Sequence, residues 1–414
     1  MFILAYLIFF ISLYRYCKKY QSPVLNFSLL YYVAASLCAV LMHYRKDNPC
    51  TIFSFIYQTT IFYLFLKPII KYGKHEISRK FVMITDKGFL QLSYVLIGLQ
   101  LFTIVFFIGY DISLLMRGDL SQIRSEMLLS GSDALGASLA RTVAGTASYF
   151  YCYNILLFFY SLAFRKDKKL LLILLIVSSS SRIFHALSYV GRDGLLFWIL
   201  SFLFSFYLFK PYLNEEAKKL IRKVFLVCGS FAFLLITAIT LSRFKASDSG
   251  VFWSLISYFG QPIDNFASMF HSTYSEWHGP KSLFPLIFGA KVQSATDLLA
   301  SVDDFEAKYG FKNNTFFSFV GNMYMSLGPF FTFIFSVIYS SYMSKKLNRR
   351  IVSLSHLTIL MIVSQVAINN YFYWAYYLRV ANLFLLTTPL FVYYFKRSNS
   401  KRENTTSPKQ LLKF

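Results

Sequence analysis

Long apolar runs, separated by short polar and basic segments, recur along the whole chain. A helix that crosses a bilayer needs about 20 mostly apolar residues, and this pattern predicts eleven such helices. They lie near residues 1–15, 25–43, 50–66, 88–110, 143–164, 170–189, 194–213, 224–242, 316–343, 352–370 and 377–395. The sequence therefore predicts an all-α, polytopic integral membrane protein, with a single transmembrane domain over residues 1–395. The first apolar run has no basic residues before it and no small-residue cleavage site, so we expect a retained helix and not a signal peptide.

Composition agrees with this pattern. Hydrophobic residues make up 56% of the chain and charged residues only 15%, which is typical of a chain embedded in lipid and not of soluble domains. The formal net charge is +23. Its lysines and arginines fall in short clusters between the apolar runs and form no separate basic domain, so we expect no nucleic-acid partner.

The distribution of charge orients the chain. If Arg15 to Lys19 lie in the cytoplasm, alternation places 28 of the 42 Lys and Arg residues inside and the remaining 14 outside, whereas 13 of the 19 acidic residues lie outside. Cytoplasmic loops of membrane proteins carry an excess of Lys and Arg. We therefore expect the N-terminus outside, the C-terminus inside, and residues 396–414 to form a basic, disordered cytoplasmic tail.

Two of the predicted outer segments are too long to be turns. The first covers about residues 111–142, where Ile112, Leu115, Met116, Leu120, Ile123 and Met127 recur at helical spacing and predict an amphipathic helix on the membrane surface. The second covers about residues 243–315. Its stretch "VFWSLISYFGQPIDNFASMF" is apolar but broken by Gly260 and Pro262, and we expect helices folded back over the membrane surface to cover a site.

Several kinds of chemistry have no signature in this chain. The five cysteines are scattered and form no CxxC pair, so neither a disulfide framework nor a structural zinc site is expected. There is no P-loop, HExxH or GxSxG motif. The stretch "HSTYSEWH" contains His271, Glu276 and His278, but its spacing is a weak signal for metal binding. We therefore expect neither a metal nor another cofactor.

The stretch "SSSSRIFHALSYVGRDGLL" at residues 178–196 sets polar and charged side chains between two apolar runs. Arg182 lies about 13 residues beyond Lys169, or roughly 20 Å across a hydrocarbon layer of roughly 30 Å. His185 shares its helix face, and Arg192 and Asp193 follow at the outer turn. A charge at such depth usually faces a polar cavity. The alternatives are that Arg182 extends to the surface and that Arg192 pairs with Asp193 as an anchor at the helix end.

Several guanidinium groups below the outer surface suit a diphosphate, because arginine presents paired, planar donors that match phosphate oxygens and stays protonated. Arg192, Arg182 and Arg243 are the candidates for the reacting centre, with His271, Glu276, Asp264 and Asp193 as candidate general bases. Further arginines at the same predicted level could bind an anionic lipid head or could be membrane anchors: Arg117, Arg124, Arg141 and Arg379.

Three short motifs and the layout of the chain resemble the bacterial O-antigen polymerases, which polymerise oligosaccharide repeat units. The motifs are "LLMRGDLSQIRSE" at 114–126, "GRDGLLFW" at 191–198 and "NNTFFSFVGNMYMSLGPFF" at 313–331, and the layout has a large outer segment before the last three helices. The family pattern after the large loop is met here by Asn314, Thr315, Gly321, Tyr324 and Gly328. Many members have an acidic-aromatic pair before the last glycine, where this chain has Ser326 and Leu327, so that acidic residue does not transfer.

The resemblance implies a metal-independent glycosyltransferase in the bacterial inner membrane. It would transfer a growing glycan from undecaprenyl diphosphate to another lipid-linked repeat unit at the outer face, for O-antigen or capsule-type polysaccharide. Donor and acceptor would be undecaprenyl-diphosphate-linked oligosaccharides within membrane lipid, and a chain-length regulator and a flippase would be partners. Arg192 would contact the diphosphate, and Asn314 and Tyr324 would line the substrate site. Tyr258, Tyr274 and Trp277 suit stacking on sugar rings or anchoring at the membrane interface.

Other functions share parts of this pattern. An O-antigen ligase has the same layout and the same diphosphate chemistry but a different acceptor. A transporter (flippase) for lipid-linked oligosaccharides usually has more helices and short loops, against which the long outer segment argues. A glycosyltransferase that uses polyprenyl monophosphate sugars normally has acidic residues in a substantial first outer loop, and here that loop, near Tyr44 to Asn48, is very short.

Overall fold

The computed structural model describes residues 2–46, 50–76, 79–117, 138–165, 167–244, 250–272, 277–289, 307–311 and 316–398. These residues are mostly helical, with one pair of short strands. The chain divides into two units, and each takes pieces from separate parts of the sequence. Unit 1 comprises Met1–Glu76, Asp248–Arg349 and Ile362–Asn382, and unit 2 comprises Ile77–Ser247, Arg350–Met361 and Leu383–Phe414.

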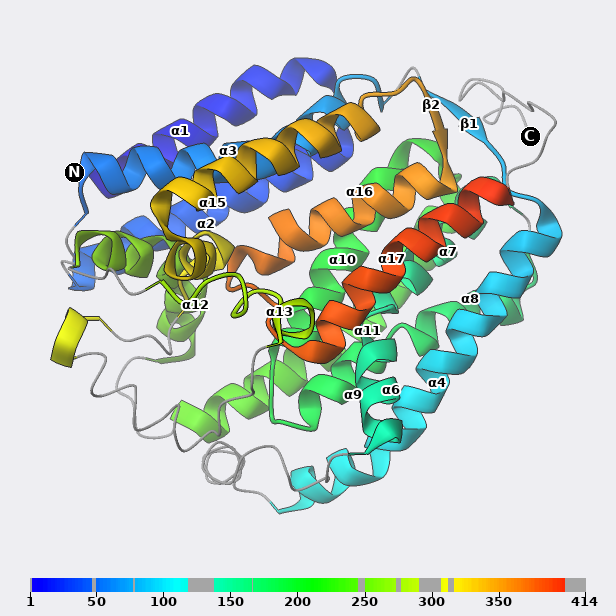
Figure 1. Cartoon of the computed structure of the whole chain (residues 1–414). Coiled ribbons are helices and arrows are strands. Elements are labelled where there is room, and N and C mark those ends of the chain that lie inside the picture. Colours follow the sequence, from blue (N-terminus) through cyan, green and yellow to red (C-terminus); the bar gives the residue numbers. More distant parts are fainter. Residues whose placement is uncertain are drawn as a thin grey trace. The chain divides into compact units, whose positions relative to one another are not determined.

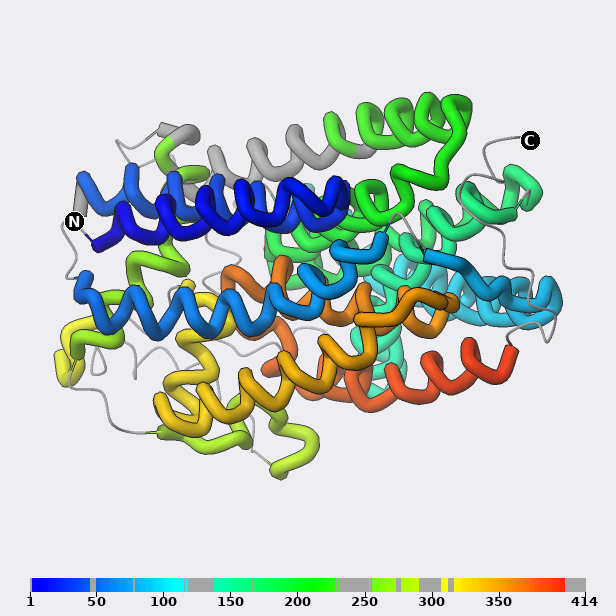
Figure 2. Tube along the Cα trace, turned by 90° about the horizontal axis from the view of Figure 1, so that it is seen from above, coloured from blue at the N-terminus to red at the C-terminus, as the bar shows by residue number. Residues whose placement is uncertain are grey.

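Unit 1 is built from long helices (Figure 1). Its elements are α1 (Phe2–Cys17), η1 (Lys18–Tyr20), α2 (Pro23–Lys46), α3 (Ile52–Gly73), α12 (Gly250–His271), α13 (Pro285–Phe288), α15 (Ser318–Leu347) and η5 (Asn369–Tyr371). Helix α2 packs against both α1 and α12, and α15 packs along α3. Figure 2 shows α1 and α2 running beside each other.

Unit 2 holds a second helical assembly and the strand pair. Its elements are β1 (Lys80–Val82), α4 (Asp86–Met116), α6 (Leu139–Ser148), α7 (Tyr151–Phe164), α8 (Lys169–Ser178), α9 (Ser181–Leu187), α10 (Asp193–Phe209), η4 (Lys210–Tyr212), α11 (Glu215–Phe244) and β2 (Ile351–Ser353). Helix α4 packs against α6, α8 and α9, and α10 packs against α7 and α9 (Figure 1). Helices α16 (Leu354–Ala367) and α17 (Arg379–Arg397) each begin in one unit and end in the other.

Each of the eleven predicted spans coincides with a helix or a pair of helices. Among the described residues, six helices are long and apolar enough to cross a membrane, and a bent pair would make a seventh. The six are Pro23–Tyr44, Ile52–Gly73, Asp86–Leu114, Lys169–Leu187, Asp193–Tyr212 and Ser318–Leu347. The bent pair is α6 with α7, which meet at 42°. The chain is thus an all-α protein with several candidate membrane spans, and the number eleven and the orientation stay predictions.

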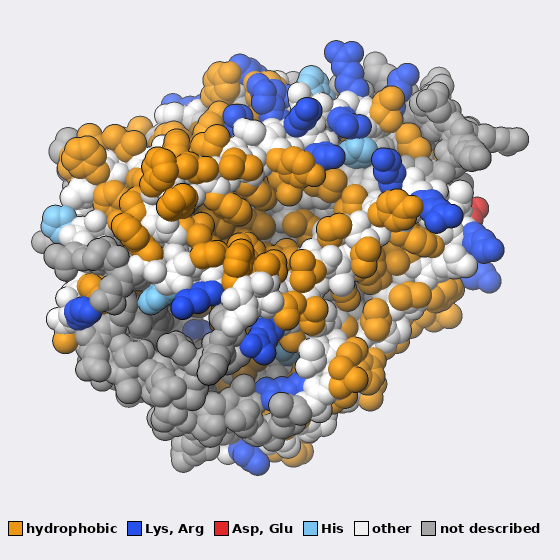
Figure 3. All heavy atoms as spheres, viewed as in Figure 1, with side chains coloured by type: hydrophobic (Ala, Val, Ile, Leu, Met, Phe, Trp, Pro, Cys, Tyr) orange, Lys and Arg blue, Asp and Glu red, His pale blue; other side chains and the backbone are white. Residues whose placement is uncertain are grey.

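The outward surfaces of these helices fit a lipid environment. Phe330, Phe331 and Ile338 on α15 are each more than 60% exposed. Leu390 and Tyr393 on α17 are equally exposed. Figure 3 shows hydrophobic side chains gathered over both helices. Contiguous apolar surface of this kind is rare on soluble monomers, so these faces suit contact with acyl chains.

Four basic residues of unit 1 lie at or beyond the C-terminal ends of α1 and α3. Lys19, which follows α1, and Lys74, which follows α3, both lie over the ring of Tyr20, at 5.4 and 5.3 Å from its centroid. Helix α1 also has a basic residue in its last turn, Arg15, and α3 has Lys71 in its last turn. The first two predicted cytoplasmic segments therefore lie at the same end of unit 1, as the predicted topology requires.

Helix α4 continues beyond the end expected for the fourth span, near residue 110, to Met116, because the residues after Asp111 are again apolar. The start of the first outer segment near residue 111 stays a prediction. Residues 112–116 of the expected amphipathic helix are the end of α4, and the rest of that expected helix lies outside the described residues.

Gly260 and Pro262 were expected to break the second segment into separate helices. Instead α12 continues through both residues. Proline removes one backbone donor from a helix, and side chains of neighbouring segments bind carbonyls around it. Gln58 Nε2 donates to Pro262 O at 3.1 Å, and Tyr371 Oη donates to Phe259 O at 2.9 Å. Packing in unit 1 thus stabilises a helix that local sequence disfavours.

Candidate functional site

The serine run before Arg182 ends α8 and redirects the chain into α9. The hydroxyls of Ser179 and Ser180 donate to backbone carbonyls of α8, those of Ile176 and Val177, at 2.6 and 2.7 Å. Serine hydroxyls compete with the backbone hydrogen bonds of a helix and so favour such breaks. Trp198 Nε1, from α10, donates to Ser179 Oγ at 2.8 Å. This hydrogen bond connects the end of α8 with α10.

Arg182 is buried at the centre of a polar cluster in unit 2, with 1% of its surface exposed. Its Nη2 donates to Asp193 Oδ2 at 2.8 Å, and its Nη1 lies 2.9 Å from His185 Nδ1. The guanidinium carbon lies 4.4 Å from the centre of the Tyr149 ring, a cation–π contact. Arg182 therefore does not extend to the surface, and its charge is balanced by Asp193.

Asp193 forms the other half of this pair, at the start of α10. Its carboxylate also accepts hydrogen bonds from Tyr189 Oη, at 3.0 and 3.2 Å. Helix N-termini favour negative charge. A buried ion pair is stable only when further hydrogen bonds satisfy its members, and Tyr189 supplies them here.

The "GRDG" turn needs its two glycines for space. A Cβ on Gly194 would lie 2.4 Å from the carbonyl oxygen of Arg182, and a Cβ on Gly191 would lie 2.3 Å from the Tyr189 ring. The preceding Val190 has a left-handed backbone, with φ of 54°. The approach at Gly194 brings α10 close to α9, and the approach at Gly191 keeps the turn tight, so that Arg182 and Asp193 meet.

His185 extends the cluster toward α6 and α4. Its Nδ1 also lies 2.9 Å from Ser148 Oγ, at the end of α6. The ring contacts Phe107 of α4, with centroids 5.2 Å apart, and Tyr189 at 5.7 Å. Sequence spacing predicted that His185 shares a face with Arg182, which is confirmed, but it gave no sign of Ser148, Tyr149 or Tyr189 as partners.

Four further arginines of the sequence hypothesis also belong to unit 2. Arg192 is half-buried at the N-cap of α10, next to the buried pair. Arg141 lies on α6 within electrostatic range of His185. Arg117 is exposed at the C-cap of α4, and the backbone of Arg243 lies at the end of α11. The structure therefore brings Arg182, His185 and Asp193 into direct contact, with Arg192 beside them in sequence and Arg141 nearby.

Asp111 belongs to this neighbourhood and was not a candidate in the sequence. It is 3% exposed on α4, one turn beyond Phe107, which covers His185. Among the described residues, neither of its carboxylate oxygens has a hydrogen-bond partner. Polar groups buried without partners are rare and mark functional positions in membrane helices. The signal in the sequence is the apolar stretch "ISLLM", which continues after the aspartate.

Unit 1 contains the other described candidates. His271 is exposed at the end of α12, and Arg379 is exposed at the start of α17. Tyr324 of α15 is half-buried among aromatic rings of α3 and α12: Tyr57 at 5.8 Å, Phe266 at 6.0 Å and Phe270 at 5.6 Å between centroids. Asp264 is fully buried and pairs with His43. Arg124, Glu276, Tyr274, Asn314 and Thr315 lie outside the described residues.

Gly328, from the motif that resembles the polymerases, forms a kink in α15. Its φ of 76° and ψ of 170° are not helical, and Pro329 follows it. The indole of Trp277 covers this glycine, since a Cβ there would lie 2.9 Å from the Trp277 ring. Tyr57 Oη donates to Pro329 O at 2.8 Å. Glycine at this position therefore permits both the kink and the approach of Trp277.

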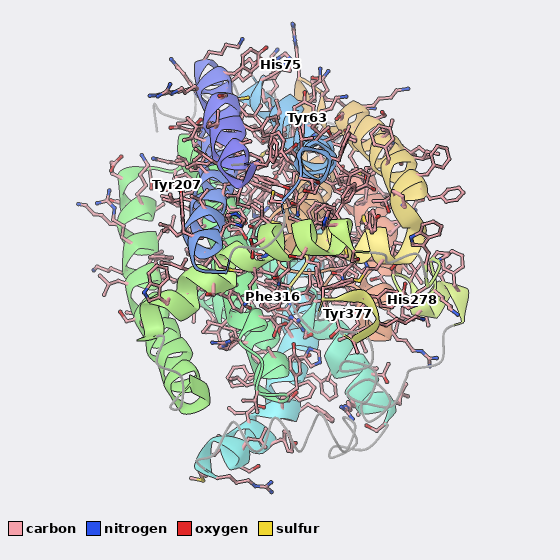
Figure 4. All side chains as sticks on the ribbon, turned by 90° about the vertical axis from the view of Figure 1, so that its left-hand side faces the viewer. Tyr63, His75, Tyr207, His278, Phe316 and Tyr377 are labelled. Atoms are coloured by element: carbon pink, nitrogen blue, oxygen red, sulfur yellow. The ribbon has the colours of Figure 1, made fainter. Side chains whose placement is uncertain are left out.

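A row of partly exposed aromatic rings lies in the same unit. Phe316 stacks on Tyr373 with centroids 5.9 Å apart, and Tyr373 meets Tyr377 edge-on at 6.3 Å. Tyr258 contacts Phe316 at 4.8 Å. Figure 4 shows Phe316 and Tyr377 in the same part of unit 1. Such rings suit stacking on sugars, the role expected for Tyr258 from the sequence.

Among the described residues, no group of three or more His, Cys, Asp or Glu side chains could hold a metal ion. No family model, curated protein or solved structure matches the chain. The resemblance to the O-antigen polymerases therefore remains a prediction from the motifs, and the function is argued from the site.

Proposed function

We propose that this protein polymerises undecaprenyl-diphosphate-linked oligosaccharide repeat units at the outer face of the bacterial inner membrane. The observation that carries the proposal is the buried Arg182–Asp193 pair, with the half-buried Arg192 on the turn beside it. This arrangement separates two tasks. Arg182 holds the turn in place, and Arg192 offers paired donors to an anionic group.

The ion pair with Asp193 explains how the charged Arg182 side chain can be buried in an apolar protein. A single charge within the hydrocarbon layer costs about 3 kcal/mol on insertion scales. Pairing Arg182 with Asp193 lowers this cost and leaves the local cluster without net charge. Arg192 and Arg141 also carry positive charge near the turn, which suits a diphosphate that becomes more negative as it leaves the sugar.

The reaction needs three things from the protein: a lipid-accessible site, a cation for the leaving diphosphate and a group that accepts the proton of the attacking hydroxyl. Exposed apolar faces on the helices favour access for a polyprenyl chain. Arg192 would stabilise the leaving group, with Arg182 as a positioning residue.

The test is deletion of the gene and complementation with variants. We expect the deletion strain to accumulate single repeat units on the lipid carrier or on the final acceptor. Arg192→Ala should lower polymer formation about 30- to 1000-fold, equivalent to a barrier higher by roughly 2–4 kcal/mol. Arg192→Lys should remain badly impaired because lysine restores charge without the planar fork. The control is Lys281→Ala, an exposed basic residue outside α10.

The same experiment separates the alternatives. Loss of a ligase would leave full-length polymer on the lipid carrier, and loss of a flippase would leave repeat units in the cytoplasmic leaflet. Normal polymer in the deletion strain would contradict the proposed function. Normal polymer with the Arg192→Ala variant would show that Arg192 is only a membrane anchor and that other residues bind the diphosphate.

A further inference from the structure

Two lysines from separate segments of unit 1 approach the same aromatic ring. The Nζ atoms of Lys19 and Lys74 lie 5.4 and 5.3 Å from the centre of the Tyr20 ring. Lys19 Nζ also lies 3.9 Å from the centre of the Tyr16 ring, and Lys74 is within electrostatic range of Tyr16. Two ammonium groups and two phenol rings thus form one group, which we call the lysine–tyrosine cluster.

The packing of α3 against the turn after α1 brings these lysines together. Gln21 closes that turn with a left-handed backbone, φ of 49°, and its N–H donates to the Lys18 carbonyl oxygen at 3.1 Å. Gly73 permits a close approach of α3, since a Cβ there would lie 2.9 Å from Ser22 Oγ. Ser22 Oγ in turn donates to the buried carboxylate of Glu76. The two segments are therefore held together by contacts that do not involve the lysines.

The positive charge of the cluster has no acidic partner in the part of the chain that the structure describes. None of the ion pairs there includes Lys19 or Lys74. Glu76 follows Lys74 closely in sequence, but its side chain is fully buried. Arg15 and Lys71, in the last turns of α1 and α3, add further positive charge. Like charges repel each other, so a bound anion would stabilise this end of unit 1.

The outward face of α1 indicates that the anion belongs to a lipid. Leu4, Ile8 and Arg15 recur on this face at helical spacing, and all three are exposed. The face thus changes from apolar to basic toward the cluster. Figure 3 shows Lys and Arg side chains along the edge where α1 and α3 end in Figure 1. Tyrosine is enriched at the level of lipid headgroups, and lysine attracts anionic lipids.

We propose that the lysine–tyrosine cluster binds the phosphate of an anionic membrane phospholipid, of which phosphatidylglycerol is a simple example. The ammonium groups of Lys19 and Lys74 bind phosphate oxygens as point charges. The hydroxyl groups of Tyr16 and Tyr20 supply further donors, and the acyl chains lie along the apolar face of α1. This binding site is independent of the proposed polymerase reaction, because all of its residues belong to unit 1 and none takes part in the chemistry.

The first experiment uses the wild-type protein. Purified protein in detergent is irradiated with phosphatidylglycerol that carries a photoactivatable group at its headgroup, and the labelled peptides are identified by mass spectrometry. We expect labels within residues 16–20 and 71–74. Unlabelled phosphatidylglycerol should prevent labelling, whereas phosphatidylcholine, whose headgroup is zwitterionic, should not. Labels only at other helix ends, or equal competition by phosphatidylcholine, would overturn the proposal.

The second experiment removes the two charges. Affinity for phosphatidylglycerol is measured by native mass spectrometry of lipid titrations. The double variant Lys19→Gln with Lys74→Gln should lower this affinity about 30-fold, which corresponds to about 2 kcal/mol for two lysines near an anionic lipid. Lys19→Arg with Lys74→Arg keeps both charges and should retain most of the affinity. Unchanged affinity in the glutamine variant would overturn the proposal.

The matched control removes two lysines that lie over tyrosine rings elsewhere. Lys210 Nζ lies 5.6 Å from the centre of the Tyr207 ring, and Lys346 Nζ lies 5.4 Å from that of Tyr342. Lys210→Gln with Lys346→Gln has the same net charge as the first glutamine variant but keeps the cluster. Its affinity should fall about threefold or less. An equal fall in both variants would show a general attraction of charge and would overturn the site.

Free phosphate provides the last test. Inorganic phosphate offers the same oxygens without acyl chains, so it should not displace the photoactivatable lipid at an equal concentration. Displacement at that concentration would identify a site for soluble anions and would overturn the assignment to a lipid. Because this test and the labelling experiment use the wild-type protein, they decide the proposal even if the glutamine variant does not fold.

Discussion

The two units each contain a buried aspartate that is paired with a nitrogen of another helix, but the pairs differ in kind. In unit 2, Asp193 binds Arg182, which lies 11 residues away and stays protonated. In unit 1, Asp264 binds His43, which is 221 residues away. The first pair fixes a local turn, whereas the second joins α2 to α12, two helices that are far apart in sequence. The basic side chain is 2% exposed in the first pair and 14% exposed in the second. The two pairs therefore differ in sequence separation, in exposure and in the chemistry of the nitrogen partner.

Removing one member of the permanent pair should have the largest effect on stability. Arg182→Met leaves Asp193 buried without its cation, which should cost about 3–5 kcal/mol of unfolding free energy. The double variant Arg182→Met with Asp193→Leu should recover much of this loss, because an apolar pair needs no compensation. Thermal unfolding in detergent, followed by the amount of monodisperse protein, measures both.

The matched change in unit 1 is His43→Leu, which removes the imidazole from Asp264. Since 14% of the His43 side chain is exposed, we expect a smaller loss of stability than with Arg182→Met. An equal or larger loss would contradict the weaker contribution expected of the partly exposed pair.

The close approach of α9 and α10 gives the next largest effect. Gly194→Ala places a Cβ 2.4 Å from the Arg182 carbonyl oxygen, and relief of such overpacking typically costs about 1–3 kcal/mol. The control is Gly98→Ala on α4, where nothing lies within 4 Å of the added Cβ. Alanine usually favours a helix over glycine, so the control should be neutral or slightly stabilising. Equal melting temperatures for the two variants would show that the Gly194 contact is not tight.

A mostly buried ion pair between α7 and α8, with side-chain exposures of 11% and 9%, offers a further case of the same interaction. Arg165 Nε donates to Asp167 Oδ2 at 2.8 Å, and Ser161 Oγ donates to the same oxygen at 2.6 Å. Burial opposes the charge of Asp167, but these hydrogen bonds outweigh it and lower the pKa of the carboxyl group. Because the folded pKa is depressed, the stabilisation is present above the ordinary value of about 3.9 and is lost as the pH falls through the folded value.

Asp167→Asn should therefore lower the melting temperature slightly, by an amount equivalent to about 1 kcal/mol or less. The loss should be the same at every pH between 5 and 8, and it should diminish below pH 4, where the wild-type carboxylate is protonated as well. Melting curves of both proteins across this range test the sign. A difference that grows as the pH falls would contradict it.

The smallest expected effect is that of chelation. If arginine side chains neutralise the leaving diphosphate, EDTA should leave polymer formation by purified protein unchanged. Loss of activity in EDTA that magnesium or manganese restores would show that a metal ion stabilises the leaving group, and Arg192 would then bind substrate without carrying that role.

The features that could be predicted from the sequence are those that depend on neighbouring residues. Each span predicted from an apolar run coincides with a helix or a pair of helices, and helical spacing correctly placed His185 beside Arg182. Both inferences use only residues close together in the chain, since helical periodicity is a local property. The same local rules also failed in defined ways. They ended the fourth span near residue 110, although "ISLLM" continues the helix to Met116.

The contacts between distant segments could not be predicted. Nothing in the pattern around His43 or Asp264 indicates that they meet, because their approach depends on how α12 packs on α2. Local rules broke α12 at Pro262, whereas Gln58 and Tyr371 reach its carbonyls from other parts of the chain. The sequence offered Asp264 as one of four candidate bases and gave no sign that His43 lies beside it.

The small parallel sheet of unit 2 has a consequence for biosynthesis. Strand β1 pairs with β2 from Lys80–Ile351 to Val82–Ser353. During synthesis, the ribosome must therefore translate the intervening stretch, including the Asp248–Arg349 portion of unit 1, before β1 can pair with β2. Until then β1 has no partner strand. A nascent chain released before residue 351 would lack this strand pair and would be open to degradation by cellular quality control.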